Sequence, residues 1–63
     1  MNKNRVDVKK PNHDQTILFK AKNSIFPDVG VWQDFGDRSE VYIPSNDDVE
    51  IVENIEWWSP IPE

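Results

Sequence analysis

The sequence contains no cysteine, only two glycines, and no apolar run longer than the three residues 17–19. Without cysteine, disulfide scaffolds, thiolate zinc sites and thiol redox motifs are excluded, although these often support domains of this size. Without a long apolar run, we expect neither a membrane span nor a secretory signal. The sequence therefore predicts a soluble, intracellular protein that is stabilised by packing or by a partner.

The composition suits one small domain spanning residues 1–63. Hydrophobic residues make up 37% of the 63 residues, and charged residues make up 30%. A chain this short buries only about 60% of the surface that its unfolded form exposes. Since so small a body does not wall a deep catalytic cleft, we predict a non-enzymatic protein that acts through its surface.

The charges divide by sign along the chain. Residues 1–22 carry six cations and two carboxylates, a sum of +4, whereas residues 23–63 carry one cation and ten carboxylates, a sum of −9. The total is the net charge of −5. Because phosphate neutralisation dominates nucleic-acid affinity, this acidic balance argues against direct binding of DNA or RNA.

Alternation of apolar and polar residues predicts a mostly β chain. The expected strands, separated by turn residues, cover residues 5–9, 16–21, 29–35 and 40–43. Residues 49–58 fit either a strand or a helix capped by Ser45 or Asn46, and their β-branched residues and tryptophans favour the strand. The elements together predict a single-domain antiparallel meander or an SH3-like, partly closed barrel of four to five strands.

The segments between and beyond these strands carry their own expectations. Residues 1–4 are polar, so we expect them to be frayed. Ile25 and Phe26 precede a proline turn and are expected to pack beneath the loop. The two prolines in residues 59–63 exclude a helix interior and a central strand, which predicts an extended tail that packs Ile61 onto the body.

Candidate catalytic and metal-binding residues are few. His13 beside Asp14 has the composition of a general base, but neither a serine in a nucleophile elbow nor a second histidine accompanies it. Asp47, Asp48 and Glu50 offer oxygen ligands for a hard cation, but the spacing of a calcium-binding loop is missing. We therefore predict no catalytic residue, no metal and no cofactor.

Three segments carry a resemblance. Residues 11–19 have the sequence PNHDQTILF, residues 29–35 have VGVWQDF, and residues 55–63 have IEWWSPIPE. They resemble the motifs L-P-E-E-G-Q-x-V-L-V, V-G-Y-Y-x-x-G-x-W/F and V-T-H-W-M-P-L-P-E of a small family of phage and prophage proteins of unknown function. The shared motif positions are Pro11, Ile17, Leu18, Gly30, Trp58, Pro60, Ile61 and Pro62.

The sequence also departs from these motifs. Residues 5–10 replace the tryptophan that usually opens these proteins, Trp57 replaces a common histidine, and Ser59 replaces methionine. The resemblance implies a phage or prophage origin, a compact and mostly β domain, and a location in the cytoplasm of an infected or lysogenic bacterial host. The family has no known activity or catalytic residues to carry over.

The aromatic side chains are too numerous for so small a core. Alternation places Trp57 and Trp58 on opposite faces of a strand, so one should be buried and the other partly exposed. We predict that an aromatic patch binds a protein partner, either a host factor or a second copy of the chain. Its residues are Trp32, Tyr42, Trp57, Trp58 and Ile61.

The carboxylates support an alternative function, the imitation of nucleic acid. An inhibitor of this class would block a host nuclease, restriction, CRISPR or repair enzyme by presenting carboxylates in place of phosphates. The candidate acidic surface comprises Asp34, Asp37, Glu40, Asp47, Asp48, Glu50, Glu53 and Glu56. Glu50, Glu53 and Glu56 would form one row if their segment were helical.

Overall fold

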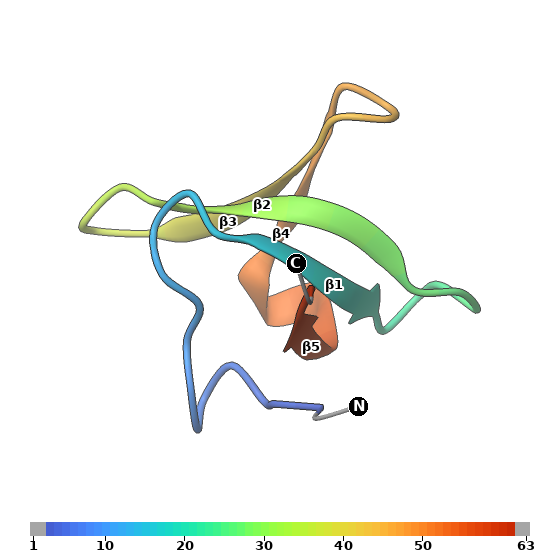
Figure 1. Cartoon of the computed structure of the whole chain (residues 1–63), viewed down its shortest axis with the longest axis horizontal. Coiled ribbons are helices and arrows are strands. Elements are labelled where there is room, and N and C mark those ends of the chain that lie inside the picture. The colour runs from blue at the N-terminus through green and yellow to red at the C-terminus, as the bar shows by residue number, and fades with distance from the viewer. Residues whose placement is uncertain (1–2, 62–63) are drawn as a thin grey trace.

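The computed structural model describes residues 3–61, which form one five-stranded antiparallel sheet (Figure 1). The elements in chain order are β1 (Thr16–Ala21), β2 (Asp28–Asp34), β3 (Ser39–Ile43), β4 (Asp48–Ile51), the 3₁₀ turn η1 (Val52–Asn54) and β5 (Ile55–Pro60). The strands lie in the order β4-β3-β2-β1-β5. This architecture confirms the predicted mostly β fold, a small antiparallel meander or partly closed barrel.

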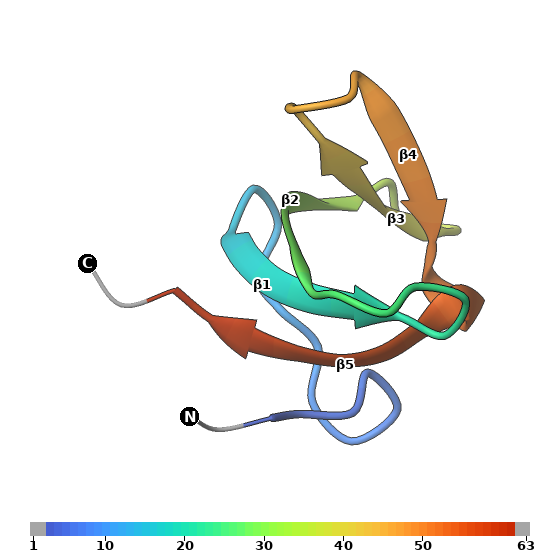
Figure 2. The same ribbon diagram turned by 90° about the vertical axis from the view of Figure 1, so that its right-hand side faces the viewer.

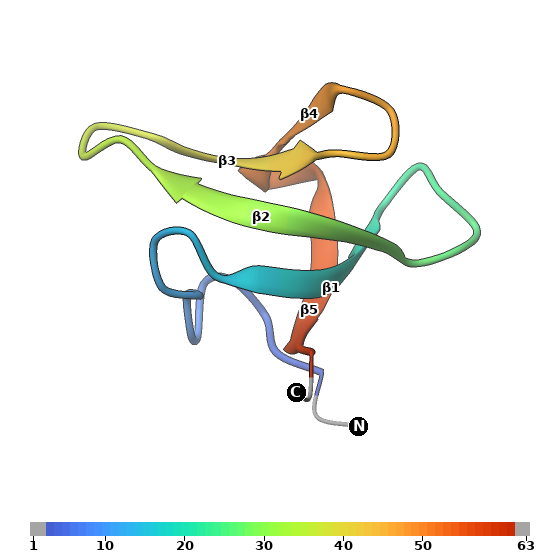
Figure 3. The ribbon, with the colours of Figure 1, turned by 45° about the horizontal axis from the view of Figure 1, so that its top comes forward.

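The sheet combines a four-stranded meander with a returning fifth strand. Each of β1 to β4 pairs with the next strand, while β5 passes back beside β1 and sets Trp58 opposite Phe19. Figure 2 shows the sheet curving, with β4 raised away from β1 and β5, and Figure 3 shows β1, β2 and β3 side by side. The curved sheet has an inner face, which holds the core, and an outer face.

The core lies on the inner face. Its buried side chains come from β1, β2, β3 and β5 and are Ile17, Phe19, Trp32, Val41, Ile43, Ile55 and Trp58. They alternate with more exposed neighbours in β1 and β3, because successive side chains of a strand point to opposite faces. The apolar periodicity of the sequence therefore decides which residues enter the core.

Gly30 allows β2 to pack closely against its neighbours. A Cβ at this position would overlap the Val41 side chain and would lie 2.9 Å from Phe19 Cε1 and from the Tyr42 carbonyl oxygen. Gly30 is itself buried. A larger residue would therefore push apart strands that now share the core.

Residues 49–58 form two strands and not one. β4 ends at Ile51, η1 turns the chain, and β5 begins at Ile55. The preference for strand is confirmed on both sides of the turn, but a continuous strand and a helix are both wrong. The turn brings the chain back to β1, where Ile55 and Trp58 are buried. Burial of these side chains outweighs the local pattern of the segment.

Asn4 is paired with β5, so the prediction that the start of the chain is frayed is wrong at this residue. Asn4 forms an antiparallel bridge with Trp58, in which the two N···O distances are 2.7 and 2.9 Å. The bridge gives β5 a partner on the side away from β1. Residues 1–2, which belong to the same prediction, lie outside the described residues.

The predicted edge strand over residues 5–9 is also wrong. Residues 6–8 form a turn, in which the Val8 and Lys9 N–H groups donate to the Arg5 carbonyl at 3.0 and 2.9 Å. The Trp58 indole N–H then donates to the Lys9 carbonyl at 2.8 Å. Alternation of apolar and polar residues indicated a strand here. The hydrogen bonds that Trp58 forms with Asn4 and Lys9 instead stabilise a turn beside β5.

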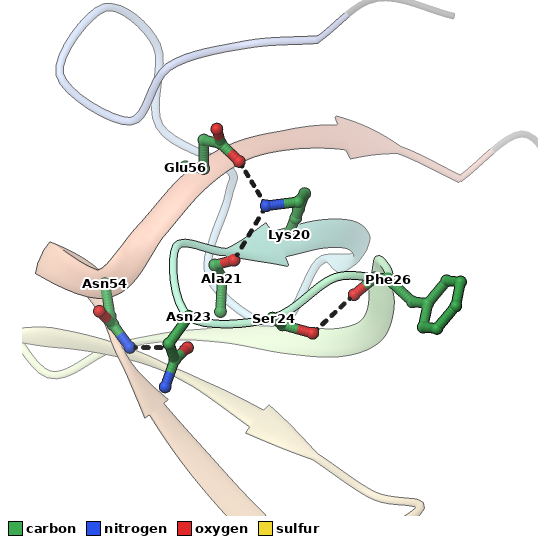
Figure 4. A network of polar contacts seen from close by, with 7 residues as sticks. All are labelled: Lys20, Ala21, Asn23, Ser24, Phe26, Asn54 and Glu56. Carbon is green, nitrogen blue, oxygen red and sulfur yellow. Dashed lines mark hydrogen bonds and ion pairs between the residues drawn. The ribbon is translucent and has the colours of Figure 1, made fainter.

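The β1–β2 loop is held by polar contacts while its apolar side chains face solvent. Ser24 Oγ donates to the Phe26 carbonyl at 3.0 Å, and Asn54 Nδ2 donates to Asn23 Oδ1 at 3.2 Å (Figure 4). Ile25 and Phe26 are 83% and 75% exposed, so their predicted packing beneath the loop is wrong. The short loop turns its tip outward, away from a core that other side chains already fill.

The chain remains extended into its C-terminal tail. Ser59 and Pro60 belong to β5, and Pro60 occupies the last position of the strand, where its missing N–H is tolerated. The extended conformation predicted for the tail is thus confirmed for these two residues. Ile61 is 36% exposed and borders a shallow hollow together with Asp14, Gln15 and Thr16. Residues 62–63 lie outside the described residues.

Candidate protein-binding surface

The structure divides the predicted aromatic patch between the core and the surface. Trp32 and Trp58 are 1% and 2% exposed and belong to the core, so they are unavailable to a partner. Trp57 is only partly buried, which confirms that Trp57 and Trp58 point to opposite faces. Burial corrects the prediction for two of the three tryptophans, because the inner faces of β2 and β5 need large side chains to fill the core.

The remaining predicted residues do not form one patch. Trp57 lies on β5 opposite Lys20, and Lys3 Nζ lies 4.9 Å from its ring centroid, within the range of a cation–π contact. Tyr42 lies on β3, and two strands separate β3 from β5 in the sheet. Ile61 follows the end of β5. The surroundings of Trp57 are thus basic and lie apart from Tyr42.

Tyr42 instead lies within an apolar row on the outer face. Val31 of β2 is paired with Tyr42, and Tyr42 is paired with Val49 of β4. Val29 lies two residues before Val31 on the same face of β2, and Val29 and Val49 are each 43% exposed. We call Val29, Val31, Tyr42 and Val49 the outer patch. Directly paired side chains in antiparallel strands contact one another, so the row forms one continuous surface.

The valines of the outer patch were not among the predicted site residues. A sequence signal for Val49 exists in β4, where the usual alternation is reversed. Asp48 and Glu50 pair with the buried residues Ile43 and Val41 and therefore lie on the inner side, while Val49 lies on the outer side. Inward-pointing charges at an edge strand discourage strand pairing between molecules. The alignment of Val31, Tyr42 and Val49 in one row depends on the register between the strands, which cannot be predicted from the sequence pattern.

A hydrogen bond orients the polar end of Tyr42. The Tyr42 hydroxyl donates to Asp47 Oδ1 at 2.9 Å. This bond, together with the negative charge of Asp47, raises the pKa of Tyr42 above its usual value of 10.0. Tyr42 is therefore a neutral, oriented side chain at physiological pH, with an apolar ring and an acidic neighbour.

The acidic row that a helix over residues 49–58 would have formed is absent among the described residues. Glu50 lies on β4, Glu53 on η1 and Glu56 on β5, because the segment is not helical. Glu56 accepts a hydrogen bond from Lys20 Nζ at 2.6 Å (Figure 4). This bond and the positive charge of Lys20 lower the pKa of the Glu56 carboxyl. Glu56 is thus neutralised within the chain.

The other candidate carboxylates are distributed over both ends of the sheet. Asp34, Asp37 and Glu40 lie in or beside the β2–β3 hairpin, whereas Asp47 and Asp48 lie at the β3–β4 turn. Among residues 3–61, none of these five, nor Glu50 or Glu53, forms an ion pair within 4.0 Å. Most of the acidic surface is therefore unpaired with basic side chains among the described residues and is divided between the two ends of the sheet.

His13 takes part in holding a loop to the sheet. Its Nδ1 accepts a hydrogen bond from the Asp34 N–H at 3.0 Å, and its Nε2 lies 3.5 Å from Asp14 Oδ2. The imidazole thereby links the turn before β1 to the end of β2. Within the described part of the chain, no three His, Asp or Glu side chains gather as metal ligands.

Two shallow hollows meet at η1 near the β2–β3 hairpin. Both are lined by Lys10, Val52 and Glu53. Arg5 and Lys22 add positive charge to one hollow, while carboxylates and Arg38 line the other. Such mixed, open and polar linings favour contact with water, and they lack the apolar walls of a typical small-molecule site.

Comparison with known proteins finds no matching family, no matching curated protein and no matching solved structure. Over residues 3–61, the structure contains no helix with the length and apolar character needed to cross a membrane. The outer patch is therefore the feature on which a functional proposal rests.

Proposed function

We propose that this chain is a non-enzymatic, small acidic protein of phage or prophage origin that binds another protein, a host factor or a second copy of itself. The observation that carries the proposal is the outer patch, an apolar row across β2, β3 and β4 that the chain leaves partly exposed. The resemblance of three segments to phage and prophage proteins supports the origin, and with it a location in the cytoplasm of a bacterial host.

The chemistry of the outer patch suits recognition better than catalysis. Tyr42 offers a large apolar ring with an oriented hydroxyl, and tyrosine is frequent among residues that dominate binding energy. Val31 and Val49 flank it with rigid β-branched side chains. His13, the residue best suited to proton transfer, is engaged by the Asp34 N–H and lies outside the outer patch.

Affinity capture from the natural host tests this proposal. The tagged wild-type protein should recover a specific protein, identified by mass spectrometry, and Val49→Ser should lose most of it. Phe35→Ser is the matched control, because Phe35 is 50% exposed but lies after β2, outside the outer patch. Retention of the partner by Val49→Ser, with the fold intact, would show that the outer patch is not the contact.

The imitation of nucleic acid remains a second proposal. The observation that favours it is the set of carboxylates without ion pairs among residues 3–61, of which Asp34, Asp37 and Glu53 line one hollow. An inhibitor of this class should release its DNA-processing target at high salt and after Asp34→Lys with Asp37→Lys. Binding that survives both changes would reject this function.

A further inference from the structure

Among residues 3–61, four of the eight exposed large apolar residues lie at one end of the sheet, and two of them, Ile25 and Phe26, are among the most exposed. Figure 3 shows the β1–β2 loop and the β3–β4 turn at the same end, opposite the β2–β3 hairpin. Ile25 and Phe26 project from the loop tip, and Val29 and Val49 lie at the starts of β2 and β4. The same end of the sheet thus carries the start of the outer patch and, on the β1–β2 loop, two large side chains that residues 3–61 leave mostly exposed.

Three carboxylates lie at this end, Asp47 beside Tyr42 of the outer face and Asp28 and Asp48 on the inner side of their strands. Asp28 and Asp48 are the first residues of β2 and β4, and Asp47 lies in the β3–β4 turn beside the Tyr42 hydroxyl. None of the three forms an ion pair among the described residues. From residue 23 to residue 63 the sequence contains a single cation, Arg38, which lies at the hairpin on the opposite end. Lys22, at the start of the β1–β2 loop, adds one positive charge to this end, but it forms no ion pair with these carboxylates among residues 3–61.

We infer that this end of the molecule docks a different protein, one whose contact surface has apolar side chains at its centre and lysine or arginine around them. The inference deepens the proposed function and rests on it. We call the site the loop-end surface; its apolar part is Ile25, Phe26, Val29, Tyr42 and Val49, and its acidic part is Asp28, Asp47 and Asp48. Charge complementarity across an interface favours the correct partner and suppresses a like-charged one.

A second copy of this chain suits the loop-end surface poorly. In a symmetric dimer the same patch meets itself, which would bring Asp28, Asp47 and Asp48 toward their own copies. Like charges that face one another across an interface oppose binding. The acidic rim therefore favours a basic partner over self-association through this surface.

The partner docks by side-chain contacts and not by adding a strand at these positions. The Val29 N–H donates to Asp28 Oδ1 at 2.8 Å, and the Val49 N–H donates to Asp48 Oδ1 at 2.8 Å. Both backbone donors at the strand starts are therefore occupied by their own chain. An added strand would have to displace these carboxylates before it could pair there.

Two synthetic amphipathic peptides test the charge preference. Each has about 18 residues, enough for five helical turns; one contains leucine and lysine, and the other contains leucine and glutamate in place of lysine. Each is titrated into the isotope-labelled full chain while its amide NMR signals are recorded. The lysine peptide should shift the signals of Phe26, Val29, Tyr42 and Val49 and bind at least about tenfold more tightly, a difference that falls at high salt.

Matched variants separate the charge from the apolar contact. Asp28→Asn with Asp48→Asn removes two charges but keeps the Oδ1 acceptors for Val29 and Val49, so the preference for lysine should shrink while the fold is kept. Phe26→Ser should weaken both peptides. Val8→Ser is the control, because Val8 is 79% exposed and lies in the N-terminal turn.

The outcomes distinguish this inference from the proposed function. Equal binding of the two peptides, or shifts centred on Asp34 and Asp37, would overturn the inference while host capture that depends on Val49 would still support the function. Shifts of the loop-end signals that grow with protein concentration alone would also overturn it, since they would identify a second copy as the occupant. Host capture that does not depend on Val49 would contradict both the proposed function of the outer patch and the inference about the loop-end surface.

Discussion

The two faces of the same strands differ in how their apolar side chains are covered. On the inner face, Trp32 and Val41 pack with the returning strand β5 and are fully buried. On the outer face, Val31 and Tyr42, their immediate neighbours along β2 and β3, remain partly exposed among residues 3–61. Apolar residues therefore occur on both faces of these strands, and a face becomes core only where other parts of the chain pack over it.

The cover on the inner side comes from both ends of the chain. Trp58 of β5 lies beside β1, and its backbone and indole N–H bind Asn4 and the Lys9 carbonyl. Val6 and Val52 pack against the edge of the core. One face is thus closed by the chain itself, and the other is available to a partner. Substitutions on each face test whether the inner face is core and the outer face is not.

The largest effect is expected from the centre of the inner face. Trp32→Ala removes a large side chain that is 1% exposed, and the cavity left behind should lower the free energy of unfolding by about 3–5 kcal/mol. For a domain of this size, such a loss is comparable to the whole stability. Circular dichroism during urea unfolding measures it, and a loss below about 1 kcal/mol would contradict the assignment of Trp32 to the core.

A matched pair of valines compares the faces directly. Val41 is buried on the inner face and Val49 is 43% exposed on the outer face of the next strand. Val41→Ala should lower the free energy of unfolding by about 1.5–3 kcal/mol, whereas Val49→Ala should change it by less than about 0.5 kcal/mol. Urea denaturation of both variants gives the comparison, and equal losses would mean that the outer patch is also core.

The smallest effect is expected from the Lys20–Glu56 pair on the surface. Because the fold lowers the pKa of Glu56, the pair stabilises the native state above the unfolded pKa, and this contribution is lost as pH falls through the folded value. Glu56→Gln should therefore be less stable than wild type at neutral pH, with the difference closing toward about pH 3. High salt should also reduce the difference.

Denaturation of both proteins at several pH values measures the contribution of this pair. The difference between wild type and Glu56→Gln separates Glu56 from the other carboxylates, which titrate in both proteins. A constant difference from neutral to acidic pH would contradict the electrostatic origin of the effect.

Several strands were predictable because the local pattern and the final environment agree. The prediction of residues 16–21 coincides with β1, that of residues 29–35 is shifted by one residue from β2, and that of residues 40–43 begins one residue after the start of β3. In each, buried residues alternate with more exposed neighbours, which fits a strand that buries one face. The prediction for residues 49–58 was wrong because the alternation of apolar residues continues through η1. The chain turns there in order to pair β5 with β1, which the local pattern does not show.

The candidate site was less predictable than the fold. Tyr42 is partly exposed, as a contact residue must be, whereas Trp32 and Trp58, which the number of aromatic residues placed in the same patch, are buried. The core needs tryptophan at both positions because its strands supply few other large side chains. Val31 carries no sign of surface exposure in the sequence, since valine is equally suited to a buried strand, and for Val49 the only sign is the pair of flanking carboxylates.

Composition and periodicity along the chain predict the mostly β fold, exclude disulfides and thiolate sites, and locate the strands of residues 16–21, 29–35 and 40–43 to within one residue. The three-dimensional packing sets which face of each strand is covered, where residues 49–58 turn, and that Val31, Tyr42 and Val49 meet in one row. The reason is physical: local pattern fixes the alternation of side chains, whereas coverage and register depend on contacts between strands that are distant in sequence.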